Sequence, residues 1–220
     1  MGIFDIIGPV MIGPSSSHTA GAARIGRMAR EILGEPVVKA KITLYGSFSD
    51  TGKGHGTDKA LAAGLMGYLP ESEEIRDALQ IAKDKGIDME FVFSNEEPAH
   101  PNTAFIQAQG KSGHKSDILG VSLGGGRIKI TEIDGISVEI TGEEYTLITN
   151  HYDVPGIVAA VSLRLANHNI NISNMRVFRK KKGLNAVMIV HTDQEVPESM
   201  IKELVDCNKN IKRVISLGII

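Results

Sequence analysis

Hydrophobic residues recur at helical spacing soon after a run of small polar residues near the start of the chain. The apolar positions between residues 25 and 33 fall every three or four residues, as in a helix with one buried face. These positions are Ile25, Met28, Ala29, Ile32 and Leu33. Gly34 and Pro36 follow directly, as is typical where a helix ends. The pattern predicts a helix that ends near Gly34, and alternation over residues 37–48 predicts a strand after it.

The rest of the first half continues with helices and then changes to strands. After a loop over residues 49–58, a short helix is expected to start near Lys59, with Leu61, Leu65 and Leu69 directed inward. A second amphipathic helix is expected over residues 72–86. Strand patterns separated by turns rich in Gly, Asp and Asn then predict an α+β domain with an antiparallel sheet. These strands are expected over residues 89–94, 102–109, 118–126, 127–134 and 136–142.

The order of elements changes near residues 142–144. From there the pattern predicts strand, helix, two strands, helix and strand within about 75 residues, a ferredoxin-like βαββαβ unit. In the first of these helices, Val158, Val161, Leu165 and Ala166 are expected on the buried side. We therefore predict a domain over residues 1–142 and a second over residues 143–220. The elements of the second are expected over residues 145–150, 155–168, 170–178, 184–192, 197–207 and 214–219.

Composition and charge exclude several classes of protein. Of the 220 residues, 42% are hydrophobic and 23% charged, which is ordinary for a globular protein. The formal net charge of −2 gives no general attraction to nucleic acid or to an anionic membrane. The basic run at residues 179–182 lies between two predicted strands, which favours a solvated hairpin turn. Neither a nucleic-acid partner nor a membrane partner is expected.

Cysteine usage and the N-terminal segment indicate the compartment. Cys207 is the single cysteine, so no intrachain disulfide can form and a reducing, cytoplasmic location is expected. The first fourteen residues carry Asp5 and have no basic n-region, so they do not resemble a signal peptide. One cysteine also cannot hold an iron–sulfur cluster or a structural zinc ion by itself.

A run of hydroxyls and a histidine, residues 15–19, leads into the first predicted helix. Free backbone N–H groups and the positive end of the helix dipole favour a carboxylate or phosphate at such a place. The alternative is simple N-capping by Ser17 or Thr19. One cap needs one hydroxyl, and this run also holds two further serines and His18. The pattern favours a substrate site.

Two further groups of polar residues follow strands. Residues 52–58, GKGHGTD, alternate glycine with polar residues and match neither a P-loop nor a dinucleotide fingerprint. We interpret them as a platform that presents His55 and Thr57, the alternative being an ordinary turn with Asp58 as N-cap. Residues 100–103, HPNT, lie between two strands, where proline fixes the chain direction. The histidines of the three groups, His18, His55 and His100, leave a zinc site as an alternative interpretation, but none of them has HxH or HxxxH spacing.

Three motifs taken together resemble the beta subunit of the iron–sulfur L-serine dehydratases. The motifs are residues 13–30, 44–60 and 99–103. The resemblance implies elimination of water from L-serine to give pyruvate and ammonia without pyridoxal phosphate. It further implies a [4Fe-4S] cluster in a partner alpha chain, where an open iron acts as Lewis acid on the serine hydroxyl.

The same resemblance implies roles for individual residues. His18 and His55 match the positions expected to handle protons. The hydroxyls and amide expected to hold the substrate carboxylate and amine, with His100 nearby, are Ser16, Ser17, Thr57 and Asn102. No metal ligand is expected in this chain. Which histidine is the base stays open.

The second predicted domain resembles an ACT domain of the serine-sensing type found in phosphoglycerate dehydrogenase. The likeness lies in the loop 151–156 and in Asn171. It implies a homodimer through this domain, with an amino-acid effector held between copies by His151, Asp153 and Asn171, where Asp153 replaces the family's amide. A unit that serves only dimerisation is the alternative.

The first half also resembles the allosteric substrate-binding domain of some phosphoglycerate dehydrogenases. Two rival interpretations therefore stay open. The chain is either a non-catalytic, amino-acid-binding regulatory subunit, or an enzyme that uses its own histidine-bound metal.

Overall fold

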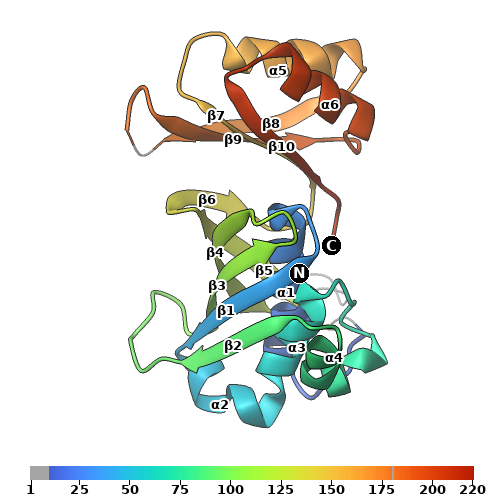
Figure 1. The fold of residues 1–220 in the computed structure, drawn as a ribbon, viewed down its shortest axis with the longest axis vertical. Helices are drawn as coiled ribbons and strands as arrows, with labels where there is room; N and C mark the ends of the chain where they lie inside the picture. Colours follow the sequence, from blue (N-terminus) through green and yellow to red (C-terminus); the bar gives the residue numbers. More distant parts are fainter. Residues whose placement is uncertain (1–9, 180) are drawn as a thin grey trace. The chain divides into compact units, whose positions relative to one another are not determined.

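The computed structural model describes residues 10–179 and 181–220 as two compact units, each of mixed helix and strand (Figure 1). The first unit ends at Thr141 and the second is Gly142–Ile220. The α+β class predicted from the sequence is confirmed. The N-terminal segment interpreted above as unlike a signal peptide lies, through residue 9, outside the described residues.

The first unit contains one sheet in the order β2-β1-β3-β4-β5-β6. Its strands are β1 Val37–Tyr45, β2 Asp88–Phe93, β3 Thr103–Gly110, β4 Lys115–Gly124, β5 Arg127–Ile133 and β6 Ile136–Ile140. The prediction of a wholly antiparallel sheet is wrong at one edge, because β2 runs parallel to β1. The chain returns from β1 to β2 through a helical crossover, and a crossover is the connection that parallel strands require.

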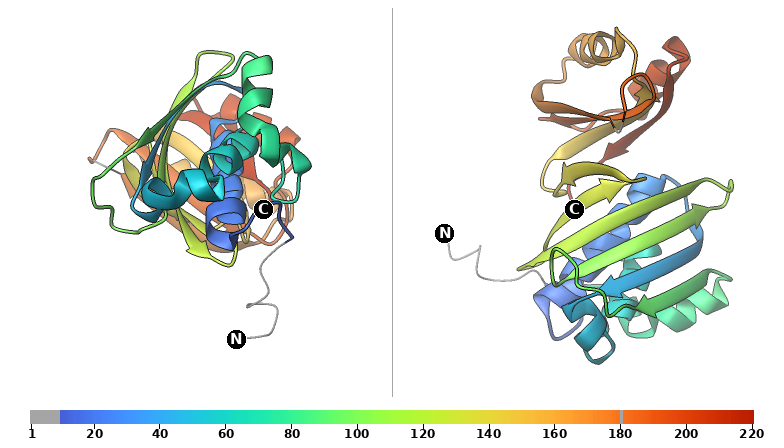
Figure 2. Two further views of the ribbon diagram at one scale, coloured as in Figure 1. Left: turned by 90° about the horizontal axis from the view of Figure 1, so that it is seen from below. Right: turned by 90° about the vertical axis from the view of Figure 1, so that its left-hand side faces the viewer.

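Helices cover one face of this sheet (Figure 2, right). A π-helical turn, Ser16–Gly21, continues into α1, Ala22–Leu33, which ends at Gly34 in the left-handed conformation with φ of 72°. Two glycines let α1 approach α3, Thr57–Leu65, closely. A Cβ at Gly64 would collide with the Ala23 carbonyl oxygen, and one at Gly26 with the Leu61 carbonyl oxygen. The core lies between these helices and the sheet, at Ile42, Leu44, Ile106, Ile118 and Ile130.

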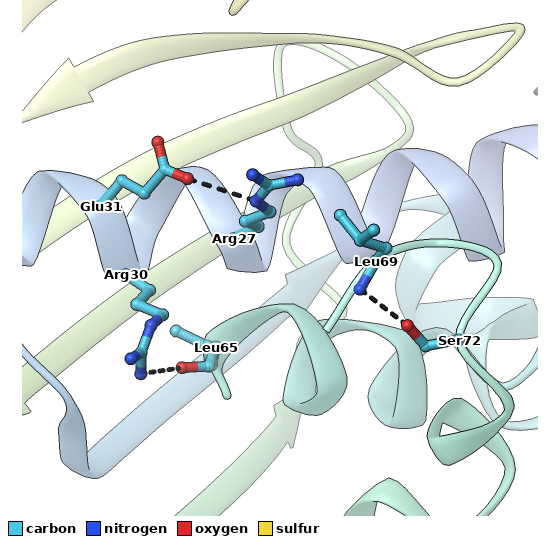
Figure 3. Close-up of polar contacts among 6 residues, drawn as sticks. All are labelled: Arg27, Arg30, Glu31, Leu65, Leu69 and Ser72. Carbon is cyan, nitrogen blue, oxygen red and sulfur yellow. Dashed lines mark hydrogen bonds and ion pairs between the residues drawn. The ribbon is translucent and has the colours of Figure 1, made fainter. Parts of the chain in front are cut away.

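Figure 3 shows polar contacts within α1, between α1 and the end of α3, and in the turn that follows α3. Arg30 donates to the Leu65 carbonyl oxygen at 3.5 Å, and Arg27 pairs with Glu31 at 3.2 Å. Leu69 is 39% exposed, so the prediction that it faces the core is wrong. The reason is that α3 ends at Leu65 and Leu69 sits in a turn, where its backbone N–H donates to the Ser72 hydroxyl.

A helix occupies most of the segment predicted as a loop. Residues Ser47–His55 form α2, and α3 begins at Thr57 rather than near Lys59. Between them Gly56, with φ of 70°, ends α2 and caps α3. Gly52 is buried where α2 faces Thr57, and a Cβ there would lie 3.4 Å from the Thr57 Cβ. A side chain at Gly52 would thus make only an ordinary contact, and it is the low helix propensity of glycine that conceals α2 in the sequence.

The helix predicted over residues 72–86 begins as a 3-10 turn, Glu73–Asp77, and continues as α4, Ala78–Asp84. Ile75 and Ala82 are buried, as predicted for the apolar face. This segment completes the crossover that leads from β1 to β2.

The second unit has the predicted βαββαβ order. Its elements are β7 Tyr145–Tyr152, α5 Ile157–Asn167, β8 Ile172–Arg179, β9 Asn185–Thr192, α6 Glu198–Cys207 and β10 Ile211–Leu217. The strands form an antiparallel sheet in the order β10-β7-β9-β8, and the core includes Leu147, Val161, Leu165, Val190 and Met200. The basic run joins β8 to β9, as predicted, with Lys180 outside the described residues.

The apolar side of α5 differs in part from the prediction. Val158 is 46% exposed and Ala166 is exposed, whereas Ile157, Val161 and Leu165 are buried. The buried residues recur at a spacing of four, because α5 starts at Ile157 and presents that stripe to the sheet. Separately, within the described residues no helix combines the length and the apolar character needed to cross a membrane.

Candidate functional site

The serine-rich run lies inside the first helix rather than before it. Ser15 is the N-cap, and its hydroxyl accepts a hydrogen bond from the His18 backbone N–H at 3.2 Å. The alternative of capping by Ser17 or Thr19 is therefore wrong. Ser16 and Ser17 occupy the first two helical positions, where backbone N–H groups have no partner within a helix. The π-helical turn directs the next residue, His18, toward α2.

His18 is held against α2 by three polar contacts. Its Nε2 lies 3.0 Å from the Thr51 hydroxyl, 3.2 Å from the Ser47 hydroxyl and 3.3 Å from the Ser47 carbonyl oxygen. The side chain is buried, with 8% exposed. Burial lowers the pKa of His18, the hydrogen bond to the Ser47 backbone opposes this shift, and the neighbouring His55 adds to it. Because its pKa is lowered, the His18 imidazole is expected to be uncharged near neutral pH and able to accept a proton.

His55 lies beside His18 and completes a histidine pair. Their ring centroids are 4.9 Å apart in an edge-to-face arrangement. Thr51 lies between them, with its hydroxyl 3.3 Å from the His55 Nδ1. The sequence analysis did not identify Thr51. Its position four residues after Ser47 and four before His55 would indicate a shared helix face, but only if this segment is interpreted as a helix.

The loop 100–102 reaches the start of α2. The Pro101 carbonyl oxygen accepts a hydrogen bond from the Phe48 backbone N–H at 3.4 Å. Gly46, with φ of 54°, permits this approach, since a Cβ there would lie 2.6 Å from the same oxygen. Asn102 donates to the Ser122 carbonyl oxygen at 3.4 Å.

Ser122 connects the first and third motifs. Its hydroxyl donates to the Ser17 carbonyl oxygen at 3.1 Å, and its backbone N–H donates to the Asn102 carbonyl oxygen at 2.9 Å. A Cβ at Gly21 would collide with the Ser122 hydroxyl, so the helix passes directly over this residue. Ser122 is buried on β4 and was not among the predicted site residues, because one serine within a strand carries no distinguishing pattern.

His100 belongs to the same loop but lines a different cavity. Its Nδ1 accepts a hydrogen bond from the Asn102 backbone N–H at 3.2 Å. The cavity beside it measures about 580 Å³ and lies over the strands, with a lining that includes Tyr45, Phe105 and Leu119. His55 instead lines a second cavity of about 520 Å³. The structure therefore places His100 behind Asn102 rather than in the cavity of the histidine pair.

Three buried polar atoms in the described residues have no hydrogen-bond partner. They are the hydroxyls of Thr19 and Thr57 and the amide oxygen of Asn102. An unpaired polar group in a protein interior costs free energy. Each of the three motifs contributes one of these atoms. Each of these atoms therefore offers a hydrogen-bonding position that a water molecule or a ligand can take.

The residues of this chain do not fit an iron–sulfur cluster. A [4Fe-4S] cluster is held by several cysteine thiolates, and the chain has one cysteine. Among the described residues, no group of three or more His, Cys, Asp and Glu side chains is arranged to hold a metal ion. An iron–sulfur cluster beside this chain would need ligands from another chain.

In the second unit, the predicted effector residues lie at opposite ends of the sheet. Asp153 pairs with Arg179 at 2.9 Å and accepts a hydrogen bond from the Gly183 backbone N–H. These two hydrogen bonds lower the pKa of Asp153. His151, at the same end, is buried, and burial lowers its pKa. Asn171 precedes the other end of β8 and donates to Asp193 at 2.8 Å. One copy of the unit does not bring Asn171 to His151.

Comparison with known proteins agrees with both units. A family described as "Serine dehydratase beta chain" matches residues 2–132, and one described as "ACT domain" matches residues 145–208. The chain is 46% identical to the probable L-serine dehydratase, beta chain, of Bacillus subtilis over 92% of this chain and 91% of that protein. It is 35% identical to the L-serine dehydratase, beta chain, of Peptoniphilus asaccharolyticus over 90% and 89%.

A more distant relative is the D-3-phosphoglycerate dehydrogenase of Synechocystis, 26% identical over 83% of this chain and 33% of that protein. The match therefore covers only part of the dehydrogenase. The two beta chains, by contrast, align along nearly their whole length. The chain belongs to the serine dehydratase beta chain family and carries a C-terminal ACT domain.

Proposed function

We propose that this chain is the beta subunit of a two-chain L-serine dehydratase that converts L-serine to pyruvate and ammonia, and that it is active only with an alpha chain. The observation that carries the proposal is the pair His18 and His55, which two separate motifs bring to 4.9 Å. The names of the two beta-chain relatives supply the substrate.

The reaction removes a proton from Cα and the hydroxyl from Cβ of L-serine. One histidine of the pair accepts the Cα proton, the C–H electrons form the Cα=Cβ bond, and the hydroxyl leaves as water after it gains a proton. The aminoacrylate formed then tautomerises and is hydrolysed to pyruvate and ammonia. Thr51 contacts both rings and so orients the pair for this transfer. The buried, neutral His18 and the more exposed His55 provide a path for the proton to solvent.

The polar groups around the pair would bind the substrate. Thr57 and Asn102 offer buried atoms without partners, and Ser16 and Ser17 offer hydroxyls at the first turn of the helix. His100 positions Asn102 through its Nδ1. The [4Fe-4S] cluster that the family resemblance implies would be held entirely by the alpha chain, since this chain has one cysteine.

For the ACT domain we propose a homodimer with L-serine bound between two copies. His151 and Asp153 of one copy would face Asn171 of the other, because one copy separates them. Titration of L-serine into the full-length chain, beside an Asn171→Ala variant, tests this role. Equal heats from both proteins would show that the effector pocket lies elsewhere.

Reconstitution tests the catalytic proposal. The purified chain alone should not turn over L-serine, and anaerobic mixing with the alpha chain should produce pyruvate. His18→Asn and His55→Asn should each be made, with His114→Asn, in the exposed turn between β3 and β4, as the control. Loss of an acid–base residue should lower kcat by roughly 10²–10⁴-fold, and the control should keep it. A mixture that never forms pyruvate would favour the alternative, a non-catalytic amino-acid-binding regulatory subunit.

A further inference from the structure

The cavity that His55 lines has walls from five parts of the first unit. They are the segment 11–14, Thr19 in the π-helical turn, the end of α2 with Gly56, Lys59 in α3, and residues 75–76. Its volume of about 520 Å³ lies in the range of small-molecule sites. The cavity has no lining residue in common with the one beside His100. It is thus a separate chamber that opens beside the histidine pair.

The charge of this chamber is positive. Among the described residues that line it, Lys53, Lys59 and Arg76 are cationic and none carries a carboxylate. The Lys59 ammonium donates to the Arg76 carbonyl oxygen at 2.9 Å, which fixes it at the wall and leaves it two further donors. Two carboxylates lie near these cations: Asp58 accepts from the Lys59 backbone N–H at 2.8 Å, and Glu73 lies 4.0 Å from Arg76 and offsets part of its charge. The ammonium groups of Lys53 and Lys59 therefore carry most of the positive charge.

The start of α3 adds to this positive field. Gly56 is its N-cap and provides no side-chain acceptor, and Gly56 and Lys59 both line the chamber. The first N–H groups of a helix favour an anion, although the Asp58 carboxylate already accepts from the N–H of Lys59. Lys53 is different from Lys59, since its ammonium lies over the Phe93 ring, 4.6 Å from the centroid. We therefore assign the main cationic contact to Lys59.

A buried hydroxyl without a partner lies in the wall of the chamber. Thr19 is 1% exposed, and its Oγ1 has no hydrogen-bond partner among the described residues. Gly13, with φ of 150°, lies directly against it, and a Cβ at Gly13 would come within 2.6 Å of the Thr19 Cγ2. Both residues line the chamber. A carboxylate oxygen here would give the hydroxyl the acceptor that the protein does not supply.

We propose that this chamber binds the α-carboxylate of the amino-acid substrate, with the Thr19 hydroxyl and the Lys59 ammonium as its ligands. The inference rests on the proposed function and adds two residues outside the sequence-derived set. A carboxylate held there places Cα beside His55, whose ring lines the same chamber. The hydroxyls of the first helical turn and Asn102 are then left for the amine and the substrate hydroxyl.

The test compares two substrates in the two-chain enzyme. Thr19→Val and Lys59→Met should raise KM for L-serine by roughly 10–100-fold, as expected for the loss of a charge-assisted hydrogen bond. The same variants should leave kcat/KM for L-serinamide, which has no carboxylate, unchanged relative to wild type. Lys39→Met is the control, because Lys39 is an exposed lysine on β1 that pairs with Asp88 far along the strand. Circular dichroism should show each variant folded.

The outcomes separate this inference from the proposed function. An active wild type whose variants keep the KM for L-serine would overturn the carboxylate site and leave the proposed function standing. A wild type without turnover would overturn the proposed function. In that case direct titration of L-serine into the two-chain complex still decides: binding weakened by Lys59→Met but not by Lys39→Met supports the site, and equal or absent binding overturns it.

Discussion

Replacing Thr57 by valine should stabilise the protein while it damages the site. Thr57 is the first residue of α3 and is 0% exposed, and its hydroxyl has no partner among the described residues. Valine has nearly the same shape and the same branching at Cβ, so packing and helix propensity change little. The substitution removes a buried polar atom that nothing in the fold satisfies.

The size of the effect follows from the cost of that atom. A buried hydroxyl without a hydrogen bond costs about 1–3 kcal/mol in protein mutational data. Its removal should raise the free energy of unfolding by up to this amount. For a chain of this length, 1 kcal/mol shifts Tm by roughly 2–4 °C, so the first unit should melt roughly 2–12 °C higher.

Thr103→Val is the matched control. Thr103 is also buried in the first unit, but its hydroxyl donates to the His100 carbonyl oxygen at 2.5 Å. Loss of that bond should lower the free energy of unfolding by about 0.5–1.5 kcal/mol and lower Tm. Calorimetric melting of the full-length chains measures both shifts, and turnover by the two-chain enzyme should fall for Thr57→Val. A Tm that falls equally in both variants would refute the argument that the Thr57 hydroxyl is unsatisfied.

Three further predictions concern pH, packing and the second unit. Burial lowers the pKa of His18, so folding favours its neutral form. The contribution of His18 to stability should be complete above the ordinary histidine pKa of about 6.5 and decline below it. His18→Asn should reduce this decline in melting curves of the first unit recorded from about two units below to about two units above that pKa. Gly64→Ala should strongly destabilise the first unit, because the added Cβ would collide with the Ala23 carbonyl oxygen. Gly218→Ala, where a Cβ would have nothing within 4 Å, should leave the urea midpoint nearly unchanged, and similar midpoints for the two variants would contradict the close approach of α1 and α3. Hydrogen bonds lower the pKa of Asp153, so its stabilising contribution should be present above the ordinary aspartate pKa of about 3.9 and lost as pH falls below it. Asp153→Asn should therefore lower the Tm of the second unit near neutral pH and leave it unchanged in strong acid. A Tm difference that persists in acid would show that the effect has another cause.

The sequence predicts most elements of the fold but not the shape of the site. Strong periodicity identifies α1 and the strands of both units, because burial dominates those segments. Residues 49–58 were interpreted as a loop because three glycines and the absence of hydrophobic residues give no helical pattern, yet α2 covers Ser47–His55. Their helix is stabilised by tertiary contacts, through Phe48, which is buried, and through Gly52, which lies against Thr57.

That misinterpretation explains which site residues were missed. The motifs identify His18 and His55 by residue type, but Thr51 becomes visible only when α2 is a helix and its side chain falls between the two rings. The sequence analysis placed Thr19 in the polar run as a possible N-cap and Lys59 at the start of a helix, and it gave neither a ligand role. Their significance comes from a chamber whose walls are distant in sequence.

The candidate site joins segments that are far apart in the chain, so it cannot form until much of the first unit has been synthesised. The crossover between β1 and β2 contains α2, and the bond from Ser122 to Ser17 joins residues 105 positions apart. Contacts of such long range form slowly, since the loop must close before they contribute stability. A nascent chain that has exposed both histidines but not yet β4 lacks this bond. The segment that carries His18 therefore gains this supporting bond late, after most of the first unit has left the ribosome.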